Sequence, residues 1–235
     1  MHERFEPGRV LAALRDPAGP TLVSLVPTTL ARLLDAGLER PPALRWALLG
    51  GAAIGDDLLQ RAAAAGVPVA PTYGMTEACS QVTTLGRPLF CTGVRLADAG
   101  EIVVSGPTVA PGCGPELRTG DLGELGPGGE LRVLGRKDDL VITGGENVSP
   151  VAVEAVLDAH PAVAESAVHG RPDAEWGQAV MATVVLHPGA VATPADLREW
   201  CAARLAPHQT PKAIYLRAAP LPRTASGKLR RRDLA

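Results

Sequence analysis

Hydrophobic and polar positions along the first third of the chain follow two different periods. Residues 7–14 place Val10, Leu11 and Leu14 on one face of a predicted helix. Short apolar runs bounded by glycine or proline predict strands, and a helical period follows each of them. Strand and helix in alternation predict a parallel sheet covered by helices, in the α/β class. The predicted elements are strand 21–26, a helix from Pro27, strand 46–49, helix 55–65 and a strand from Val67.

The pattern changes after residue 80 and again after residue 140. Between these points, short apolar runs separated by glycine and proline turns predict a small antiparallel or barrel-like sheet. The last part predicts a compact α+β domain of roughly 100 residues. The predicted elements are strands 93–96, 101–105, 130–134 and 140–143, a helix carrying Val153, Val156 and Leu157, strands 164–169 and 179–186, a helix from Thr193 and strand 213–216.

A charged link separates the two parts. Residues 136–139 carry four consecutive charges, which resist burial and predict an exposed connector. Gly144 and Gly145 follow the next strand, and glycine allows a positive φ or a close approach of the backbone to a ligand. Ser149-Pro150 predicts a helix start with a hydroxyl at the N-cap. The expected organisation is a large domain at 1–134, a hinge at 135–139 and a small domain at 140–235.

Composition narrows the possible functions. The net charge is −2 and the basic residues are scattered, so no basic block predicts binding to nucleic acid or to an anionic membrane. No apolar run approaches the ~20 residues that span a bilayer, and the N-terminus resembles no signal peptide. The four cysteines are widely spaced, form no zinc-binding pair and fit a reducing compartment. We therefore expect a cytoplasmic protein with no membrane span and no nucleic-acid partner.

Three stretches carry candidate chemistry. They are Tyr73-Gly74-Met75-Thr76-Glu77, the link and glycine loop at 135–150, and Pro222-Arg223-Thr224-Ala225-Ser226-Gly227-Lys228. Singly, each also fits an ordinary turn, helix cap or solvated tail. Together, and in this order, they resemble the adenylate-forming superfamily of acyl-CoA synthetases, adenylation domains and luciferases, over nearly the whole chain.

The resemblance implies a two-step reaction. A carboxylic acid attacks the α-phosphate of ATP and gives an acyl adenylate, and the thiol of coenzyme A then takes the acyl group. Thr76 would contact the α-phosphate, and Glu77 would bind Mg²⁺ through a hard carboxylate oxygen. Lys228 would contact the substrate carboxylate and the α-phosphate, where a fixed cation stabilises the charge that builds up in the transition state.

The resemblance also implies a nucleotide site. Small residues in the Gly-Gly-Ala-Ala loop would leave room for the adenine ring. The carboxylate of Asp121, in Thr119-Gly120-Asp121, would accept hydrogen bonds from the ribose hydroxyls, although the same residues fit a polar turn. Arg136 would reach the same sugar. The residues implied in nucleotide binding are Gly50, Gly51, Ala52, Ala53, Tyr73, Gly74, Asp121 and Arg136.

A hinge follows from the same resemblance. One lysine cannot occupy the site while the arm of coenzyme A enters it, so the small domain would rotate about Asp138 between the two steps. The rotation would bring Gly144 and Gly145 to the thiol channel, which side chains would block. The alternative for Asp138 is a surface charge on a rigid loop.

Within the superfamily, residues 23–34 and 71–81 are most similar to the o-succinylbenzoate–CoA ligases of menaquinone biosynthesis. Other aryl or fatty acyl-CoA synthetases are alternatives.

The superfamily carries a glycine-rich phosphate loop upstream of the Thr-Glu motif, and this sequence shows none, so we expect Met1 to align with the middle of a family member. The expected partners are a small carboxylic acid, ATP and coenzyme A, with a homo-oligomer or a separate N-terminal chain. The alternative function is a truncated, non-catalytic remnant that binds a nucleotide or a partner.

Overall fold

The computed structural model describes residues 5–224 and 229–234, and the chain divides into two compact units. The first unit extends to Thr119 and includes Gly123–Val133. The second unit contains Gly120–Leu122 and the chain from Leu134 onward. The expected pivot at residues 135–139 stays a prediction.

The first unit is built on a five-stranded sheet in the order β1-β2-β3-β4-β5. The first three strands are parallel, as the alternation of strands and helices predicts. The last two run antiparallel, and the sequence pattern did not predict them. The strands are β1 (Leu22–Leu25), β2 (Trp46–Leu49), β3 (Val69–Met75), β4 (Ser80–Thr84) and β5 (Arg87–Pro88).

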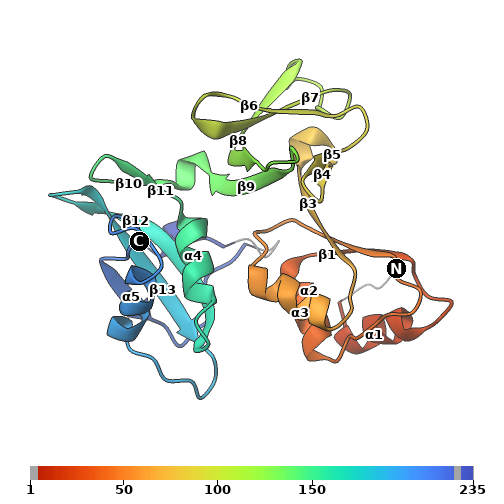
Figure 1. The fold of residues 1–235 in the computed structure, drawn as a ribbon, viewed down its shortest axis with the longest axis horizontal. Coiled ribbons are helices and arrows are strands. Elements are labelled where there is room, and N and C mark those ends of the chain that lie inside the picture. The colour runs from red at the N-terminus through yellow and green to blue at the C-terminus, as the bar shows by residue number, and fades with distance from the viewer. Residues whose placement is uncertain (1–4, 225–228, 235) are drawn as a thin grey trace. The chain divides into compact units, whose positions relative to one another are not determined.

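Three helices accompany this sheet, and α2 contacts both of the others (Figure 1). Proline occupies the first turn of α1 and α2, where its missing N–H leaves no hydrogen bond unmade. The fully buried Leu14, Leu30 and Leu33 share one core with residues of β1 and β2. The helices are α1 (Pro7–Arg15), α2 (Pro27–Asp35) and α3 (Asp56–Ala64).

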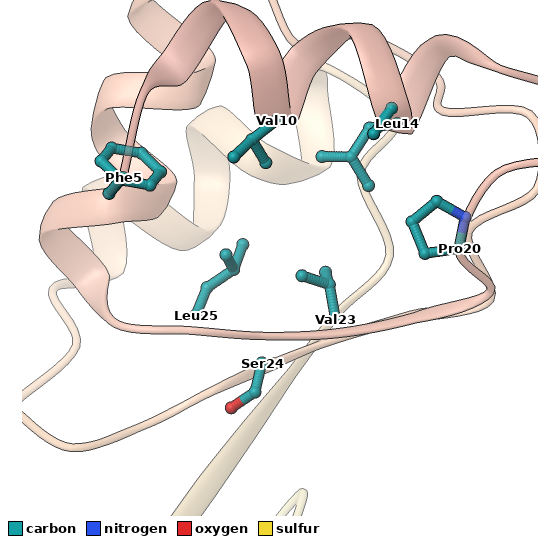
Figure 2. Close-up of a pocket in the computed structure, with 8 residues that line it drawn as sticks. Phe5, Val10, Leu14, Pro20, Val23, Ser24 and Leu25 are labelled. Carbon is teal, nitrogen blue, oxygen red and sulfur yellow. The ribbon is translucent and has the colours of Figure 1, made fainter. Parts of the chain in front are cut away.

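A cavity of about 310 Å³ lies between α1 and β1. Figure 2 shows Val23 and Leu25 pointing toward Val10 and Leu14 of α1, while Ser24 points to the other side of the strand. This alternation is the ordinary geometry of a strand with one face against a helix. The lining is largely apolar and includes none of the predicted site residues.

A second sheet has four strands in the order β6-β7-β8-β9. Its long strand β8 has 10 residues, and the sequence pattern did not predict it. The buried positions of β8 include Thr119, Asp121 and Gly123, so its inner face lacks the large apolar residues that mark a strand. The strands are β6 (Gly93–Leu96), β7 (Glu101–Ser105), β8 (Glu116–Leu125) and β9 (Leu131–Arg136).

The second unit has the α+β architecture that the sequence predicts. Its sheet has the order β11-β10-β13-β12, with β14 paired to β13, and α4 packs on β12 while α5 packs on β14 (Figure 1). Valine and leucine side chains of these elements form one buried core. The elements are β10 (Val141–Thr143), β11 (Glu146–Val148), α4 (Pro150–Asp158), β12 (Val163–Asp173), β13 (Gly177–Leu186), α5 (Pro194–Ala202) and β14 (Ala213–Leu216).

Two local predictions for this unit need correction. Gly144 and Gly145 form the two-residue turn of a hairpin between β10 and β11, with positive φ at both positions, so a strand follows the glycines before the helix begins. The hydroxyl of Ser149 does not cap α4, because it donates instead to the Leu134 carbonyl at 2.7 Å. The helix predicted from Thr193 is confirmed, and the Thr193 hydroxyl caps it by accepting from the N–H of Asp196.

None of the helices in the described part of the chain combines the length and the apolar character needed to cross a membrane.

Candidate functional site

The Gly-Gly-Ala-Ala loop follows β2 and lies beside β3. The N–H of Gly50 donates to the Leu25 carbonyl at 3.2 Å, and the Thr72 hydroxyl donates to the Leu49 carbonyl at 3.1 Å. A methyl group on Gly50 would collide with the Thr72 hydroxyl. Packing against β3 therefore accounts for this glycine, whereas Gly51, Ala52 and Ala53 are exposed and leave open space at the carboxyl end of the strand.

Thr76 and Glu77 lie in η1 (Thr76–Ala78), a single 3₁₀ turn directly after β3. Gly74 precedes the turn, and any Cβ there would overlap the Ser80 carbonyl of β4, so only glycine allows this approach. Ala78 is fully buried and anchors the turn. The two site side chains are exposed, and no residue of the described chain bonds to either of them. Their oxygens therefore face outward from a fixed turn.

Tyr73 is half-buried and packs against the same core cluster as Ala78. Its backbone belongs to β3, which leads into the turn that carries Thr76 and Glu77. The predicted residues of the first unit thus occupy two neighbouring segments, one after β2 and one at the end of β3.

Asp121 and Arg136 meet in the second unit. Arg136 Nε lies 2.9 Å from Asp121 Oδ1, across the neighbouring strands β8 and β9. The Asp121 side chain is 11% exposed and that of Arg136 is 56% exposed, so the arginine covers a nearly buried carboxylate. An ionised carboxylate accepts several hydrogen bonds, which suits it to hydroxyl donors as well as to one arginine. The structure brings together the two residues expected to bind one sugar.

The hairpin turn at Gly144 and Gly145 lies against an aromatic side chain. The N–H of Gly144 donates to the Trp176 carbonyl at 2.9 Å, and a methyl group on Gly144 would overlap the Trp176 ring. Lys212 Nζ lies 4.4 Å from the centre of that ring, which is a cation–π distance. Trp176 is not among the residues predicted from the sequence, where a single tryptophan in a polar turn was its only signal.

Two predicted residues remain to be placed. Asp138 is exposed in η3 (Lys137–Asp139), the 3₁₀ turn that joins β9 to β10, and its role as a pivot stays a prediction. Lys228 lies outside the described residues. The other predicted site residues divide between the two units. The first unit contains those between Gly50 and Glu77, and the second unit contains Asp121, Arg136, Gly144 and Gly145.

The residues present are suited to a magnesium ion held mainly by its substrate. Within the part of the chain that the structure describes, His, Cys, Asp and Glu side chains form no group of three or more that could hold a metal. Mg²⁺ commonly keeps several waters and takes one or two protein carboxylates together with phosphate oxygens. The exposed carboxylate of Glu77 fits this binding mode.

Two family models match the chain. The model described as "AMP-binding enzyme" matches residues 2–113, and the model described as "AMP-binding enzyme C-terminal domain" matches residues 152–228. Among curated proteins, a 2-succinylbenzoate–CoA ligase of Bacillus licheniformis is 37% identical over 100% of this chain and 55% of its own length. The corresponding ligase of Bacillus cereus is 41% identical over 92% of this chain and 52% of its own length.

Solved structures with a similar fold come from the same kind of enzyme. An o-succinylbenzoate CoA synthetase from Bacillus subtilis, in complex with the acyl-adenylate intermediate, has a TM-score of 0.88 and 37% identity, over 99% of this chain and 54% of its own. The same enzyme in complex with ATP and magnesium ion also has a TM-score of 0.88. The chain spans about half the length of the curated relatives it matches. The expected fold, a partial large α/β domain followed by a small α+β domain, is confirmed.

Proposed function

We propose that this chain, which belongs to the AMP-binding enzyme family, carries the nucleotide-binding and thiol-binding parts of an acid–CoA ligase. The ligase would convert a carboxylic acid and ATP into an acyl adenylate and pyrophosphate. It would then convert the adenylate and coenzyme A into an acyl-CoA thioester and AMP. The observation that carries the proposal is the identity of 37% to 2-succinylbenzoate–CoA ligase along the full length of the chain.

In the first step, the first unit would receive the phosphates. Thr76 would donate its hydroxyl hydrogen to an α-phosphate oxygen, and Glu77 would hold Mg²⁺, which screens the phosphate charge when bound. Their exposure on a turn anchored by Ala78 supports these roles. Gly51, Ala52 and Ala53 would lie along the base, where their lack of long side chains leaves room for a flat ring.

The second unit would hold the sugar. Asp121 would accept hydrogen bonds from the ribose hydroxyls while Arg136 keeps the carboxylate oriented. Lys228 would place its ammonium on the attacking carboxylate and on the α-phosphate. Because charge increases at phosphorus as the new bond forms, this cation stabilises the transition state more than the bound substrates.

In the second step, the thiol would pass the Gly144–Gly145 turn. The backbone of this turn is held by the Trp176 carbonyl, so its position is fixed without a side chain at either glycine. Attack by the thiol on the acyl carbon breaks the bond to the phosphate oxygen and releases AMP. Trp176 and Lys212 form an aromatic and cationic surface beside this turn.

The proposed acid is o-succinylbenzoate, which would place the reaction in menaquinone biosynthesis. Support comes from the relatives named for this acid and from a neighbour solved with its adenylate. A cytoplasmic location accompanies the proposal, because all four cysteines are free thiols, as is usual in a reducing compartment.

A complementation assay tests the proposal. The chain is mixed with ATP, Mg²⁺, o-succinylbenzoate and coenzyme A, alone and together with the remaining half of the Bacillus subtilis ligase. We expect pyrophosphate release and thioester formation, both reduced on the order of 10²–10³-fold in Lys228→Ala. Benzoate and a fatty acid, each tested in place of o-succinylbenzoate, serve as control acids. Folded protein with no release in either mixture would contradict the proposal, and nucleotide binding without release would instead indicate a non-catalytic binding module.

A further inference from the structure

The parallel strands of the first sheet pack their helices on one face. Residues of α1, α2 and α3 form one core with residues of β1, β2 and β3. The strand residues in this core alternate along each strand, and they are Val23, Leu25, Ala47, Leu49 and Val69. Because successive side chains of a strand point to opposite faces, this core lies on one face of the sheet. The residues between these positions belong to the opposite face.

The opposite face carries large apolar side chains that stay exposed. Leu22 of β1 is 56% exposed and Trp46 of β2 is 42% exposed, and the strand register places them directly beside each other. Ser24 and the half-buried Leu48 form a further pair on the same two strands. Figure 2 shows Ser24 on the side of the strand away from α1. None of these four residues belongs to a core cluster of the described chain, and we call them the open face.

An open face is unusual for parallel strands. Parallel sheets occur almost only where both faces are covered, whereas an antiparallel sheet can leave one face in water. β1 is also the edge strand of its sheet, so no described strand lies beyond Leu22. Neighbouring exposed apolar side chains are a frequent mark of a protein–protein interface, and tryptophan is enriched among the residues that contribute most to binding. The open face therefore has the character of a surface that another layer covers.

The length of the relatives indicates what this layer is. The match to the Bacillus licheniformis ligase uses 100% of this chain but only 55% of the ligase, and the solved Bacillus subtilis synthetase is covered over 54% of its chain. The model of the C-terminal domain matches residues 152–228, so the half of the relatives that this chain does not match lies on the N-terminal side. That half is about as long as this chain, which is enough to cover one face of a sheet.

We propose that the open face is the docking surface for the N-terminal half of an AMP-binding enzyme, which would lay an apolar layer across Leu22, Trp46 and Leu48. The inference concerns binding and does not require the reaction proposed above. The same region borders the predicted base-binding loop. Val26, which follows β1, is 39% exposed, and a methyl group on Gly51 would lie 3.4 Å from its side chain. A partner on the open face would therefore lie close to this loop.

Association in solution tests the docking surface without requiring turnover. The chain is co-expressed with the N-terminal half of the Bacillus subtilis ligase, so that neither half has to fold alone, and the complex is measured by sedimentation over a dilution series. We expect a one-to-one complex whose Kd rises about 30–100-fold in Trp46→Lys and about tenfold in Leu22→Lys, because each would bury an ammonium without a partner. Val191→Lys is the matched control, since Val191 is an apolar residue of the second unit that is 91% exposed.

Three results would overturn the proposal. The first is the absence of a complex between the two soluble halves. The second is a complex that Trp46→Lys weakens no more than Val191→Lys does. The third is a dimer of this chain alone that Trp46→Lys dissociates, because a second copy would then be the occupant of the open face.

Hydroxyl-radical labelling examines the open face in the unmodified chain. In the free chain we expect Trp46 to be labelled readily, and in the complex we expect it to lose most of its labelling while Val191 keeps its own. A Trp46 already protected in the free monomer would show that the chain covers its own sheet, and would overturn the proposal.

Turnover separates this inference from the proposed function. A complex that depends on Trp46 but releases no pyrophosphate would contradict the proposed function and support the docking surface. Pyrophosphate release that neither Trp46→Lys nor Leu22→Lys lowers, at the same concentration of the N-terminal half, would overturn the docking surface and leave the proposed function standing.

Discussion

The two units of the molecule fix their candidate site residues by different means. In the first unit, Thr76 and Glu77 are exposed on a short turn, and backbone packing sets their position through Gly74 and Ala78. In the second unit, ion pairs between strands, helices and the tail hold shielded carboxylates in place. These pairs are Asp121–Arg136, Glu165–Arg223 and Glu154–Arg231.

The difference has a consequence for mutation. A site fixed by close backbone approach is sensitive to added volume, whereas a site fixed by ion pairs is sensitive to the loss of one charge. An unpaired charge that remains shielded costs far more than an exposed one. The Thr76–Glu77 turn and the three ion pairs named above should therefore respond to different substitutions.

Breaking the Glu154–Arg231 pair should have the largest effect. Glu154→Ala leaves the guanidinium of Arg231 and the N–H of Val168 without this acceptor, and we expect the second unit to lose about 3 kcal/mol of unfolding free energy. Urea unfolding gives the value. The control is Asp35→Ala in the first unit, which removes a pair whose side chains are 42% and 66% exposed and should cost at most about 1 kcal/mol. Equal losses in the two variants would show that shielding is irrelevant here.

Adding volume at Gly74 should be next in size. Gly74→Ala forces β3 and β4 apart at the Ser80 carbonyl, so we expect the first unit to lose about 1–3 kcal/mol. Gly8→Ala is a matched control, because a methyl group there meets no atom within 4 Å and alanine favours a helix. Thermal unfolding distinguishes them: Gly8→Ala should melt at or above the wild-type temperature, and a similar drop in both would refute close packing at Gly74.

The smallest effect should come from Asp158, at the end of α4. Burial raises the pKa of Asp158 to about 6, a hydrogen bond from Ser166 opposes the rise, and the charge of Glu154 adds to it. The native protein therefore binds a proton between about pH 6 and pH 4 that the unfolded chain does not bind, so this carboxylate destabilises the fold above pH 6 and ceases to do so below about pH 4.

Asp158→Asn should remove that cost. We expect the variant to be about 1 kcal/mol more stable than the wild type at pH 8, because partial exposure of the residue reduces the effect, and equally stable at pH 4. Urea unfolding of both proteins at the two pH values gives the difference. A constant difference across this range would contradict the raised pKa.

Elements with strong periodicity could be predicted from the sequence. The helices at 7–15, 27–35, 56–64 and 194–202 and the parallel strands of the first unit carry large apolar residues at regular spacing. Strand β8 could not be predicted, because Thr119, Asp121 and Gly123 fill its buried face. The short strand β11 was not predicted for another reason: the two glycines before it indicated a loop rather than a tight hairpin turn.

The residues of the candidate site were likewise predicted only in part from the sequence. Family resemblance pointed to Asp121 and Arg136, and the structure places them in contact. The ion pair of Arg231 could not be predicted, because its partner Glu154 lies 77 residues away in the sequence. In its local sequence, each residue has the pattern of an ordinary solvated charge. Trp176 was missed because its relation to Gly144 arises only when the turn before β13 folds against the β10–β11 hairpin.

The most direct test of the account is binding of a non-hydrolysable o-succinylbenzoyl sulfamoyl adenosine, measured by titration calorimetry. We predict saturable binding by the chain and a Kd about 10–100-fold weaker in Asp121→Asn, because the ribose hydroxyls lose a charged acceptor. Glu124→Gln on the same strand, which removes only an exposed ion pair with Arg132, should bind as the wild type does. No binding by the folded chain, or equal binding by Asp121→Asn and the wild type, would contradict the proposed nucleotide site.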